Sequence, residues 1–306
     1  MSKKFIVATR PSLLAFTQTQ QTVALLKEKN PSVEFEILKI STHGDKVKNK
    51  PLTEFGGTGV FVKELENAIL EGKAHFAVHS LKDVPSIQPE GLSLVAFPKR
   101  EDARDVILVR NGQNFADLAD NCVIGTGSPR RKVQVAQIKP KAVFKELRGN
   151  IDTRIEKLEK GEYDAIILAA AGLSRLKKTY PQIVFLDLEK CIPAVGQGAI
   201  ALECKTADTE TIAILRSIND NYTELAITAE RSYMKTIGGG CKFPLGAHAT
   251  IEENKILLSV MLGNHLTGEI INMNDKALIS EAKELGKTLA INVLEEAKNS
   301  GMEILY

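Results

Sequence analysis

Cationic and hydroxyl side chains recur directly after short apolar segments of this chain. Arg10 and Ser12 follow the apolar stretch 5–9, and Ser128 follows the stretch 123–126. Free N–H groups at a helix start favour an anion, and an arginine adds a fork that matches a carboxylate. A serine at a helix start is also commonly only an N-cap, which is the alternative interpretation. The recurrence of the pattern in both halves of the chain favours an anion site.

The arginines are concentrated in the middle of the chain. Eight of the eleven lie between Arg100 and Arg175, although 40 basic and 38 acidic residues leave a net charge of only +2. Such a balance gives no reason to expect nucleic acid or an anionic membrane as a partner. Clustered arginines suit a small polyanion such as a carboxylate or a phosphate, with a solvated surface as the alternative. The side chains that could converge on one cleft are Arg10, Ser12, Ser128, Arg130, Arg131, Arg148, Arg154 and Arg175.

Two other groups could take part in chemistry. Asp83 would place a carboxylate at the mouth of the cation-rich cleft, where it could pair with Lys82 or an arginine, or stabilise a cation formed during a reaction. Cys241 follows three glycines, so its thiol could be accessible, although a structural cysteine beside a turn is the alternative. The four cysteines form no CxxC pair and no Cys/His cluster, so we expect no metal.

The elements that must position these side chains alternate between strand and helix. Apolar runs predict strands over 5–9, 33–40, 75–79, 92–97, 106–109, 123–126, 142–147 and 165–168. Helical spacing predicts helices over 12–29, 60–71, 129–138 and 153–160. The polar, glycine-bearing stretch 42–59 predicts a long loop. This alternation is typical of α/β domains with largely parallel sheets.

A weak internal repeat indicates how the domains are organised. Segment 6–12 resembles 123–129, and segment 72–78 resembles 161–167, in the same order. We therefore expect two similar α/β domains, with a strand over 198–204 that could return to the first. Strands over 247–252, 256–262 and 269–274, with helices over 222–235 and 278–299, predict a small α+β domain. The expected boundaries are 1–98 with 196–217, 99–195, and 218–306.

Composition excludes several classes of protein. The chain has 306 residues, of which 43% are hydrophobic and 25% charged, as in an ordinary globular protein. No uncharged apolar run approaches the roughly 20 residues of a membrane helix. Arg10 also interrupts the apolar start too early for a signal peptide. We expect a cytoplasmic monomer that binds neither membrane nor nucleic acid.

Ten short segments, taken together and in order, resemble the porphobilinogen deaminase (hydroxymethylbilane synthase) family over nearly the whole chain. They are 8–12, 59–66, 78–85 (VHSLKDVP), 100–102, 125–131, 147–150 (LRGN), 153–154, 161–166 (GEYDAI), 193–198 (PAVGQG) and 239–241. No single segment is specific to the family, but the occurrence of all ten in this order is specific.

The resemblance implies two lobes like those of periplasmic binding proteins, with mixed sheets, and a small C-terminal α+β domain. It implies a dipyrromethane cofactor joined through a thioether to Cys241. It also implies an enzyme that joins four porphobilinogen molecules head to tail on this primer, releases ammonia at each step and frees linear hydroxymethylbilane by hydrolysis.

The resemblance also assigns roles to residues. Asp83 would stabilise the cationic azafulvene left by ammonia. The cofactor would be held by Lys82, Asp83, Ser128, Arg130, Arg131, Arg154 and Cys241. The incoming substrate would be held by Arg10, Ser12, Arg148, Arg154 and Arg175. His43, Glu54 and Thr58 stand where the family often has basic residues, so the loop over 42–59 is less basic and its contacts to substrate are in doubt.

A two-lobed binding protein without catalysis is the rival interpretation. A secreted solute receptor should carry a signal peptide, and a regulator should carry a DNA-binding helix-turn-helix. Neither sign is evident in this sequence. Neither class needs a cysteine on a glycine loop, which favours the enzyme.

Overall fold

The structure, a computed structural model, describes residues 3–46, 59–238 and 243–304. The chain forms two compact units. Unit 1 combines residues 1–50, 55–101 and 198–225, and unit 2 combines residues 51–54, 102–197 and 226–306.

A five-stranded sheet forms the middle of unit 1. Its strands are β1 (Lys3–Thr9), β2 (Val33–Lys39), β3 (Phe76–Ser80), β4 (Leu92–Ala96) and β10 (Ile200–Lys205). Their order is β2-β1-β3-β10-β4. β1 runs parallel to β2 and β3, whereas β10 runs antiparallel to β3 and β4. The predicted return of segment 198–204 to the first sheet is therefore confirmed by β10.

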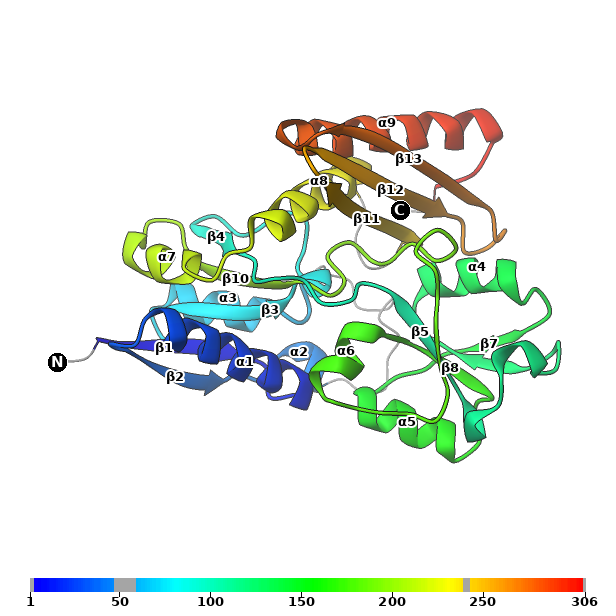
Figure 1. Ribbon diagram of the computed structural model, residues 1–306, viewed down its shortest axis with the longest axis horizontal. Coiled ribbons are helices and arrows are strands. Elements are labelled where there is room, and N and C mark those ends of the chain that lie inside the picture. The colour runs from blue at the N-terminus through cyan, green and yellow to red at the C-terminus, as the bar shows by residue number, and fades with distance from the viewer. Residues whose placement is uncertain (1–2, 47–58, 239–242, 305–306) are drawn as a thin grey trace. The chain divides into compact units, whose positions relative to one another are not determined.

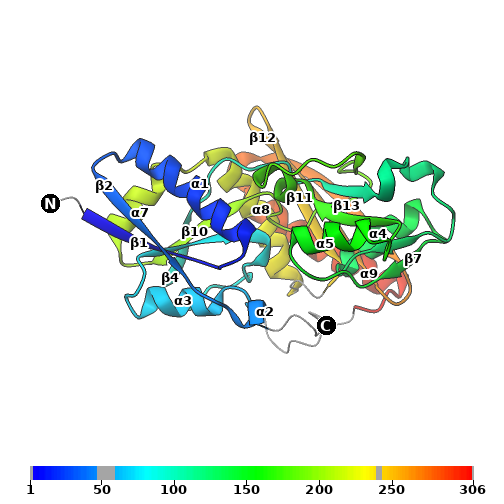
Figure 2. The ribbon, with the colours of Figure 1, turned by 90° about the horizontal axis from the view of Figure 1, so that it is seen from below.

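Helices cover both faces of this sheet. α1 (Leu13–Lys29) and α7 (Thr209–Arg216) pack on one face, and α3 (Lys63–Leu70) packs on the other (Figure 2). Alternation along β1 explains this, because Phe5 and Val7 join the α1 core whereas Ala8 joins the α3 core. Unit 1 also contains the short helices α2 (His43–Lys46) and η2 (Leu81–Asp83).

Unit 2 contains a second five-stranded sheet. Its strands are β5 (Asp105–Val109), β6 (Val123–Gly125), β7 (Val143–Lys145), β8 (Ala165–Ala169) and β9 (Ile183–Phe185), in the order β7-β6-β8-β5-β9. Its helices are α4 (Pro129–Ile138), α5 (Ile151–Glu159), α6 (Ala170–Arg175), η3 (Arg110–Gly112) and η4 (Phe115–Asp117). Figure 1 shows α4 and α5 on opposite sides of this sheet.

The two sheets share one topology, which confirms the predicted repeat. In each, three neighbouring strands are parallel, the next strand is antiparallel to them, and the outermost strand is antiparallel to that one. The mixed sheets are as the resemblance implied. The expectation of largely parallel sheets was wrong, because strand-helix alternation does not reveal the direction of a strand that arrives from a distant segment.

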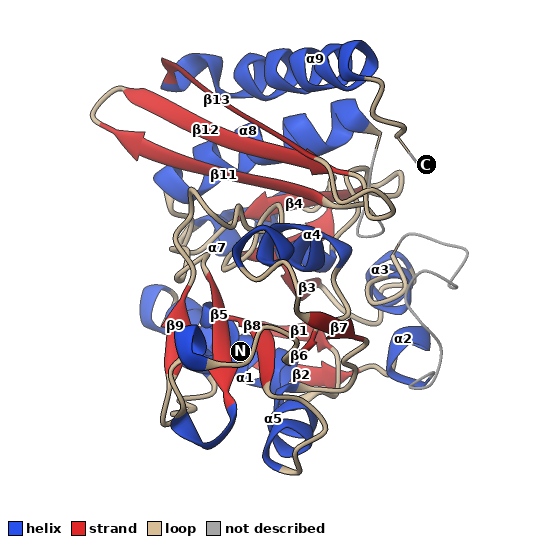
Figure 3. Ribbon diagram, turned by 90° about the vertical axis from the view of Figure 1, so that its right-hand side faces the viewer, coloured by secondary structure: helices blue, strands red, loops and turns tan. Residues whose placement is uncertain are grey.

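The C-terminal part of unit 2 is a three-stranded antiparallel sheet covered by two helices (Figure 3). Its elements are β11 (Leu245–Glu252), β12 (Lys255–Gly263), β13 (Ile270–Leu278), η5 (Ile279–Glu281), α8 (Asn221–Ile237, which begins in unit 1) and α9 (Ala282–Ser300). Tyr233 is fully buried, and its hydroxyl donates to the carbonyl of Met261 at 3.1 Å. This α+β arrangement is as predicted, while the exact domain boundaries stay a prediction.

Among the α-helices and strands, four short ones were not predicted: α2, α6, α7 and β9. α6 has only six residues and β9 only three, too few for a periodic pattern to emerge. α7 carried a signal in the sequence, because Asp208 is a favoured N-cap residue, and in the structure it accepts a hydrogen bond from the Thr211 N–H. α2 lies at the start of the predicted loop 42–59, most of which falls outside the described residues.

Candidate active site

Arg10 and Asp83 meet at one edge of the unit 1 sheet. Arg10 follows β1, and Asp83 ends the η2 turn that follows β3. The carboxyl ends of parallel neighbouring strands lie at the same edge, which is where open α/β sheets bind ligands. The Arg10 Nη1 atom lies 4.0 Å from the Asp83 Oδ2 atom.

The η2 turn holds Asp83 through its apolar neighbours. Leu81 and Val84 are buried, and the Leu81 N–H donates to the carbonyl of Ala199 at 3.1 Å. The Asp83 side chain keeps 32% of its surface exposed. The buried anchors therefore present an accessible carboxylate at a defined place. Lys82 lies on the same turn.

Arg10 is itself held from two further sides. Its Nη2 atom donates to Asp45 Oδ1 at 2.6 Å, and its guanidinium carbon lies 4.2 Å from the ring centre of Phe61. Asp45 also accepts hydrogen bonds from the N–H and hydroxyl of Thr42. Burial alone would raise the pKa of Asp45, but Arg10 and Thr42 hold it below its usual value. Asp45 is therefore ionised and holds the Arg10 guanidinium group in place.

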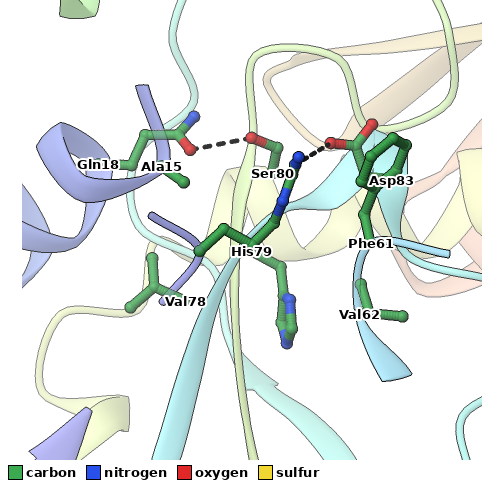
Figure 4. A pocket seen from close by; sticks show the side chains of 9 residues that line it. Ala15, Gln18, Phe61, Val62, Val78, His79, Ser80 and Asp83 are labelled. Carbon is green, nitrogen blue, oxygen red and sulfur yellow. Dashed lines mark hydrogen bonds and ion pairs between the residues drawn. The ribbon is translucent and has the colours of Figure 1, made fainter. Parts of the chain in front are cut away.

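A small pocket opens beside this pair (Figure 4). Gln18, Phe61, Val62 and Ser80 line it together with Arg10 and Asp83. The Ser80 hydroxyl donates to the Gln18 side-chain oxygen at 2.9 Å. Ser12 is the N-cap of α1, where its hydroxyl oxygen accepts from the Ala15 N–H at 3.4 Å.

Three titratable side chains are buried on the α3 side of the same strand. His79 Nε2 lies 2.9 Å from Glu203 Oε2, and Glu66 of α3 is buried as well. Burial, then the negative charge of Glu203, raise the pKa of Glu66 to about 7, while His79 and Lys63 oppose the rise. Glu66 therefore exchanges its proton near neutral pH.

In unit 2, the predicted cationic residues Arg130 and Arg131 occupy the first turn of α4. Ser128 is the N-cap of this helix and Pro129 is its first residue. Arg130 and Arg131 are only 4% and 7% exposed, and both form ion pairs with the fully buried Asp105. Burial alone would raise the pKa of Asp105, but the two guanidinium groups hold it well below its usual range.

Arg148 lies in the turn after β7, and Arg154 lies in α5, the helix that follows this turn. Arg154 Nε donates to the carbonyl of Gly149 at 2.8 Å, and Gly149 has a φ of +113°, a conformation that suits glycine. Arg148 Nε donates to Glu146 Oε1 at 3.1 Å. The Arg148 Nη2 atom is buried and has no hydrogen-bond partner among the described residues.

The predicted site residues thus form groups within each unit. Arg10 and Asp83 face each other in unit 1, where Lys82 shares the η2 turn with Asp83 and Ser12 caps the helix that follows Arg10. In unit 2, Arg130 and Arg131 share Asp105, Arg148 and Arg154 share the Gly149 turn, and Arg175 is a buried residue of α6. Cys241, Glu54 and Thr58 lie outside the described residues. His43 begins α2, where its N–H donates to Glu64 Oε1 at 2.7 Å.

Sequence reasoning missed the carboxylates that orient these arginines. Asp45 and Asp105 had no assigned role, although each contacts a predicted arginine directly. Asp105 carried a signal, since a charged residue immediately before the apolar run 106–109 suggests a buried partner. Asp45 carried none. Within the described ranges, no group of three His, Cys, Asp or Glu side chains could hold a metal ion.

Two family descriptions match most of the chain. Residues 5–213 match "Porphobilinogen deaminase, dipyromethane cofactor binding domain", and residues 224–295 match "Porphobilinogen deaminase, C-terminal domain".

Similar whole proteins carry the same name. A porphobilinogen deaminase from Sulfurimonas denitrificans is 40% identical over 301 residues, covering 96% of this chain and 95% of the relative. The Brevibacillus brevis protein is 46% identical over 262 residues, covering 85% of each chain. The Bacillus subtilis protein is 41% identical, covering 95% of this chain and 92% of the relative. Among solved structures, the BvgS VFT2 domain of Bordetella pertussis is 15% identical with a TM-score of 0.42, covering 75% of this chain and 91% of that domain.

Proposed function

The chain belongs to the porphobilinogen deaminase family, and on that premise we propose which of its residues carry the reaction. The enzyme is a hydroxymethylbilane synthase, a transferase of tetrapyrrole biosynthesis. It joins four porphobilinogen molecules head to tail with release of ammonia, on a dipyrromethane cofactor, and then releases the linear product by hydrolysis.

We propose that it works as a cytoplasmic monomer that needs neither nucleic acid nor membrane. No helix within the described ranges is long and apolar enough to cross a membrane. The net charge of +2 also offers no strong field for a polyanionic surface.

Asp83 is the proposed catalytic residue. The observation that carries this assignment is its exposed carboxylate, 4.0 Å from Arg10 at the ligand-binding edge of the sheet. When ammonia leaves porphobilinogen, positive charge develops on the pyrrole. A carboxylate already fixed by the η2 turn stabilises that charge without rearrangement. Arg10 is proposed to bind a substrate carboxylate beside it.

The residues of unit 2 fit an acidic cofactor. Dipyrromethane carries acetate and propionate groups, so its site must supply unsatisfied cationic donors. The buried and unpaired Nη2 atom of Arg148 is such a donor for the equally acidic substrate. Two guanidinium groups against the single carboxylate of Asp105 leave a further positive charge. When bound, the cofactor supplies the pyrrole carbon from which the chain is extended.

The proposed contacts follow from this chemistry. Cofactor carboxylates are assigned to Lys82, Ser128, Arg130, Arg131 and Arg154, with Asp83 near the pyrrole nitrogens and Cys241 as the point of attachment. Substrate carboxylates are assigned to Arg10, Ser12, Arg148, Arg154 and Arg175. Arginine forks explain how a protein of nearly neutral charge can hold a chain that gains two carboxylates at each step.

Mass spectrometry tests the cofactor assignment. The purified enzyme should weigh more than its sequence by two linked pyrrole units, and a peptide map should place the added mass on the peptide containing Cys241. Active protein of unmodified mass, or modification of another cysteine, would contradict the assignment.

Substitution tests the role of Asp83. Asp83→Asn keeps the shape of the side chain but removes its charge, so it should fold and carry the cofactor while kcat falls about 100-fold or more. Glu90→Gln, an exposed neutral substitution in the same unit, is the control. Turnover of Asp83→Asn close to that of the control would refute the catalytic role.

A further inference from the structure

Asp105 is the meeting point of four buried groups in unit 2. Its Oδ2 atom accepts from Arg130 Nη1 at 2.7 Å, and its Oδ1 atom accepts from Arg131 Nη2 at 2.7 Å and from Gln197 Nε2 at 2.8 Å. The Cys191 thiol lies 3.6 Å from Oδ2. A single carboxylate therefore determines where two guanidinium groups lie.

These two guanidinium groups would not meet without a shared partner. Successive residues of a helix point about 100° apart, so Arg130 and Arg131 leave α4 in different directions. Two adjacent cations also repel each other in a buried place. Asp105, at the start of β5, draws both to one point, and the backbone carbonyls of Ile192 and Ile167 each accept one further N–H.

The cluster keeps an excess of positive charge. Asp105 is the only acidic residue that forms an ion pair with Arg130 or Arg131 within the described ranges. Cys191 does not balance the second cation, because burial and the charge of Asp105 raise the pKa of its thiol to about 12. The Nε and Nη2 groups of Arg130 make no hydrogen bond to a described residue. These donors are available to an acidic ligand.

The cluster also connects to the C-terminal sheet. The carbonyl of Ile192 accepts from Arg130, and the carbonyl of the next residue, Pro193, accepts from the Ala247 N–H of β11 at 3.0 Å. β11 begins at Leu245, four residues after Cys241 in the sequence. One chain of contacts thus joins the two arginines to the strand that follows the attachment cysteine.

We propose that Asp105 is a positioning residue for the cofactor: it aligns Arg130 and Arg131 as one unit whose remaining donors and excess positive charge hold the carboxylates of dipyrromethane. The proposal rests on the proposed role of these two arginines. Asp105 does not touch the cofactor, and it acts through the guanidinium groups that it orients.

The test compares the fraction of protein that carries the cofactor in two variants that each lose one buried carboxylate. Asp105→Asn removes the charge while preserving shape. Glu230→Gln is the matched control, because Glu230 is also a fully buried carboxylate of unit 2 and accepts from the N–H groups of Gly196 and Ala249. Both variants should melt at lower temperature. Intact-mass analysis should find at least a tenfold smaller fraction carrying the two-pyrrole mass in Asp105→Asn than in Glu230→Gln. Equal occupancy in the two variants would overturn the proposal.

A second variant covers the case in which Asp105→Asn does not fold. The double variant Asp105→Asn, Arg131→Gln restores the natural excess of one positive charge, so it should fold and still lose the two-pyrrole mass. Full occupancy in this variant would also overturn the proposal. Arg131→Gln alone separates the two levels of inference: normal occupancy in it would remove Arg131 from the proposed cofactor site, whatever Asp105→Asn does.

Discussion

Replacing Glu66 by glutamine should make the enzyme more stable at alkaline pH and leave its stability at pH 4.5 almost unchanged. Glu66 is 6% exposed on the face of α3 that packs against the unit 1 sheet. Its neighbours include the buried carboxylate of Glu203, the imidazole of His79 and the ammonium of Lys63. Burial and Glu203 dominate, so the pKa of Glu66 rises from 4.5 to about 7.

The size of the effect follows from this change. An unfolded chain releases the Glu66 proton near pH 4.5, whereas the folded chain retains it until about pH 7. Across that window the folded state binds more protons than the unfolded state, so its stability falls as the pH rises. One pKa unit corresponds to about 1.4 kcal/mol, so ionisation of Glu66 across this window lowers the free energy of unfolding by roughly 3 kcal/mol. Glutamine has the same shape and does not ionise, so Glu66→Gln avoids this cost.

Urea denaturation at a series of pH values between about 4.5 and 8.5 measures the difference. The free energy of unfolding of Glu66→Gln minus that of the natural protein should be near zero at the acid end, increase up to about pH 7 and then level off. Glu71→Gln, which changes an exposed carboxylate at the end of the same helix, should show no such curve. A difference that does not vary with pH would refute the reasoning, because it would mean that Glu66 ionises alike in both states.

Two further substitutions test other parts of the molecule. Arg148→Leu should raise the KM for porphobilinogen about tenfold or more, because the buried Nη2 group of Arg148 has no partner among the described residues and is free to bind a carboxylate. The same substitution should lower the free energy of unfolding by less than about 1 kcal/mol, because the ion-pair partner of Arg148, Glu146, is half-exposed. Steady-state kinetics and urea titration check this pair of values, and an equally large loss of stability would indicate a structural role instead. Gly286→Ala should destabilise unit 2 by about 1–3 kcal/mol, because the added Cβ would overlap the backbone carbonyl oxygen of Ala229 where α9 crosses α8. An unchanged melting temperature would contradict this, because it would mean that α8 and α9 can move apart to fit the Cβ without loss of stability.

The local architecture of the site could be predicted from the sequence. Ser12 and Ser128 each precede a helix and follow an apolar strand, and both are N-caps in the structure. The order of ten short motifs indicated the family, and the segment 79–85 indicated a carboxylate at a strand end. These features depend on contacts between residues close in the chain, which composition and spacing express directly.

The partners of the charged side chains were decided by the tertiary structure alone. Asp45 lies 35 residues from Arg10, Asp105 lies 25 residues from Arg130, and Glu203 lies 124 residues from His79. The first and third pairs meet because β1 lies beside β2 and β3 lies beside β10, and the second because α4 packs over the sheet that contains β5. Hydrophobic periodicity does not specify the order of these strands or the direction of β5 and β10. The sequence thus identified which arginines could bind an acidic ligand, whereas the fold determined which carboxylates hold them in place.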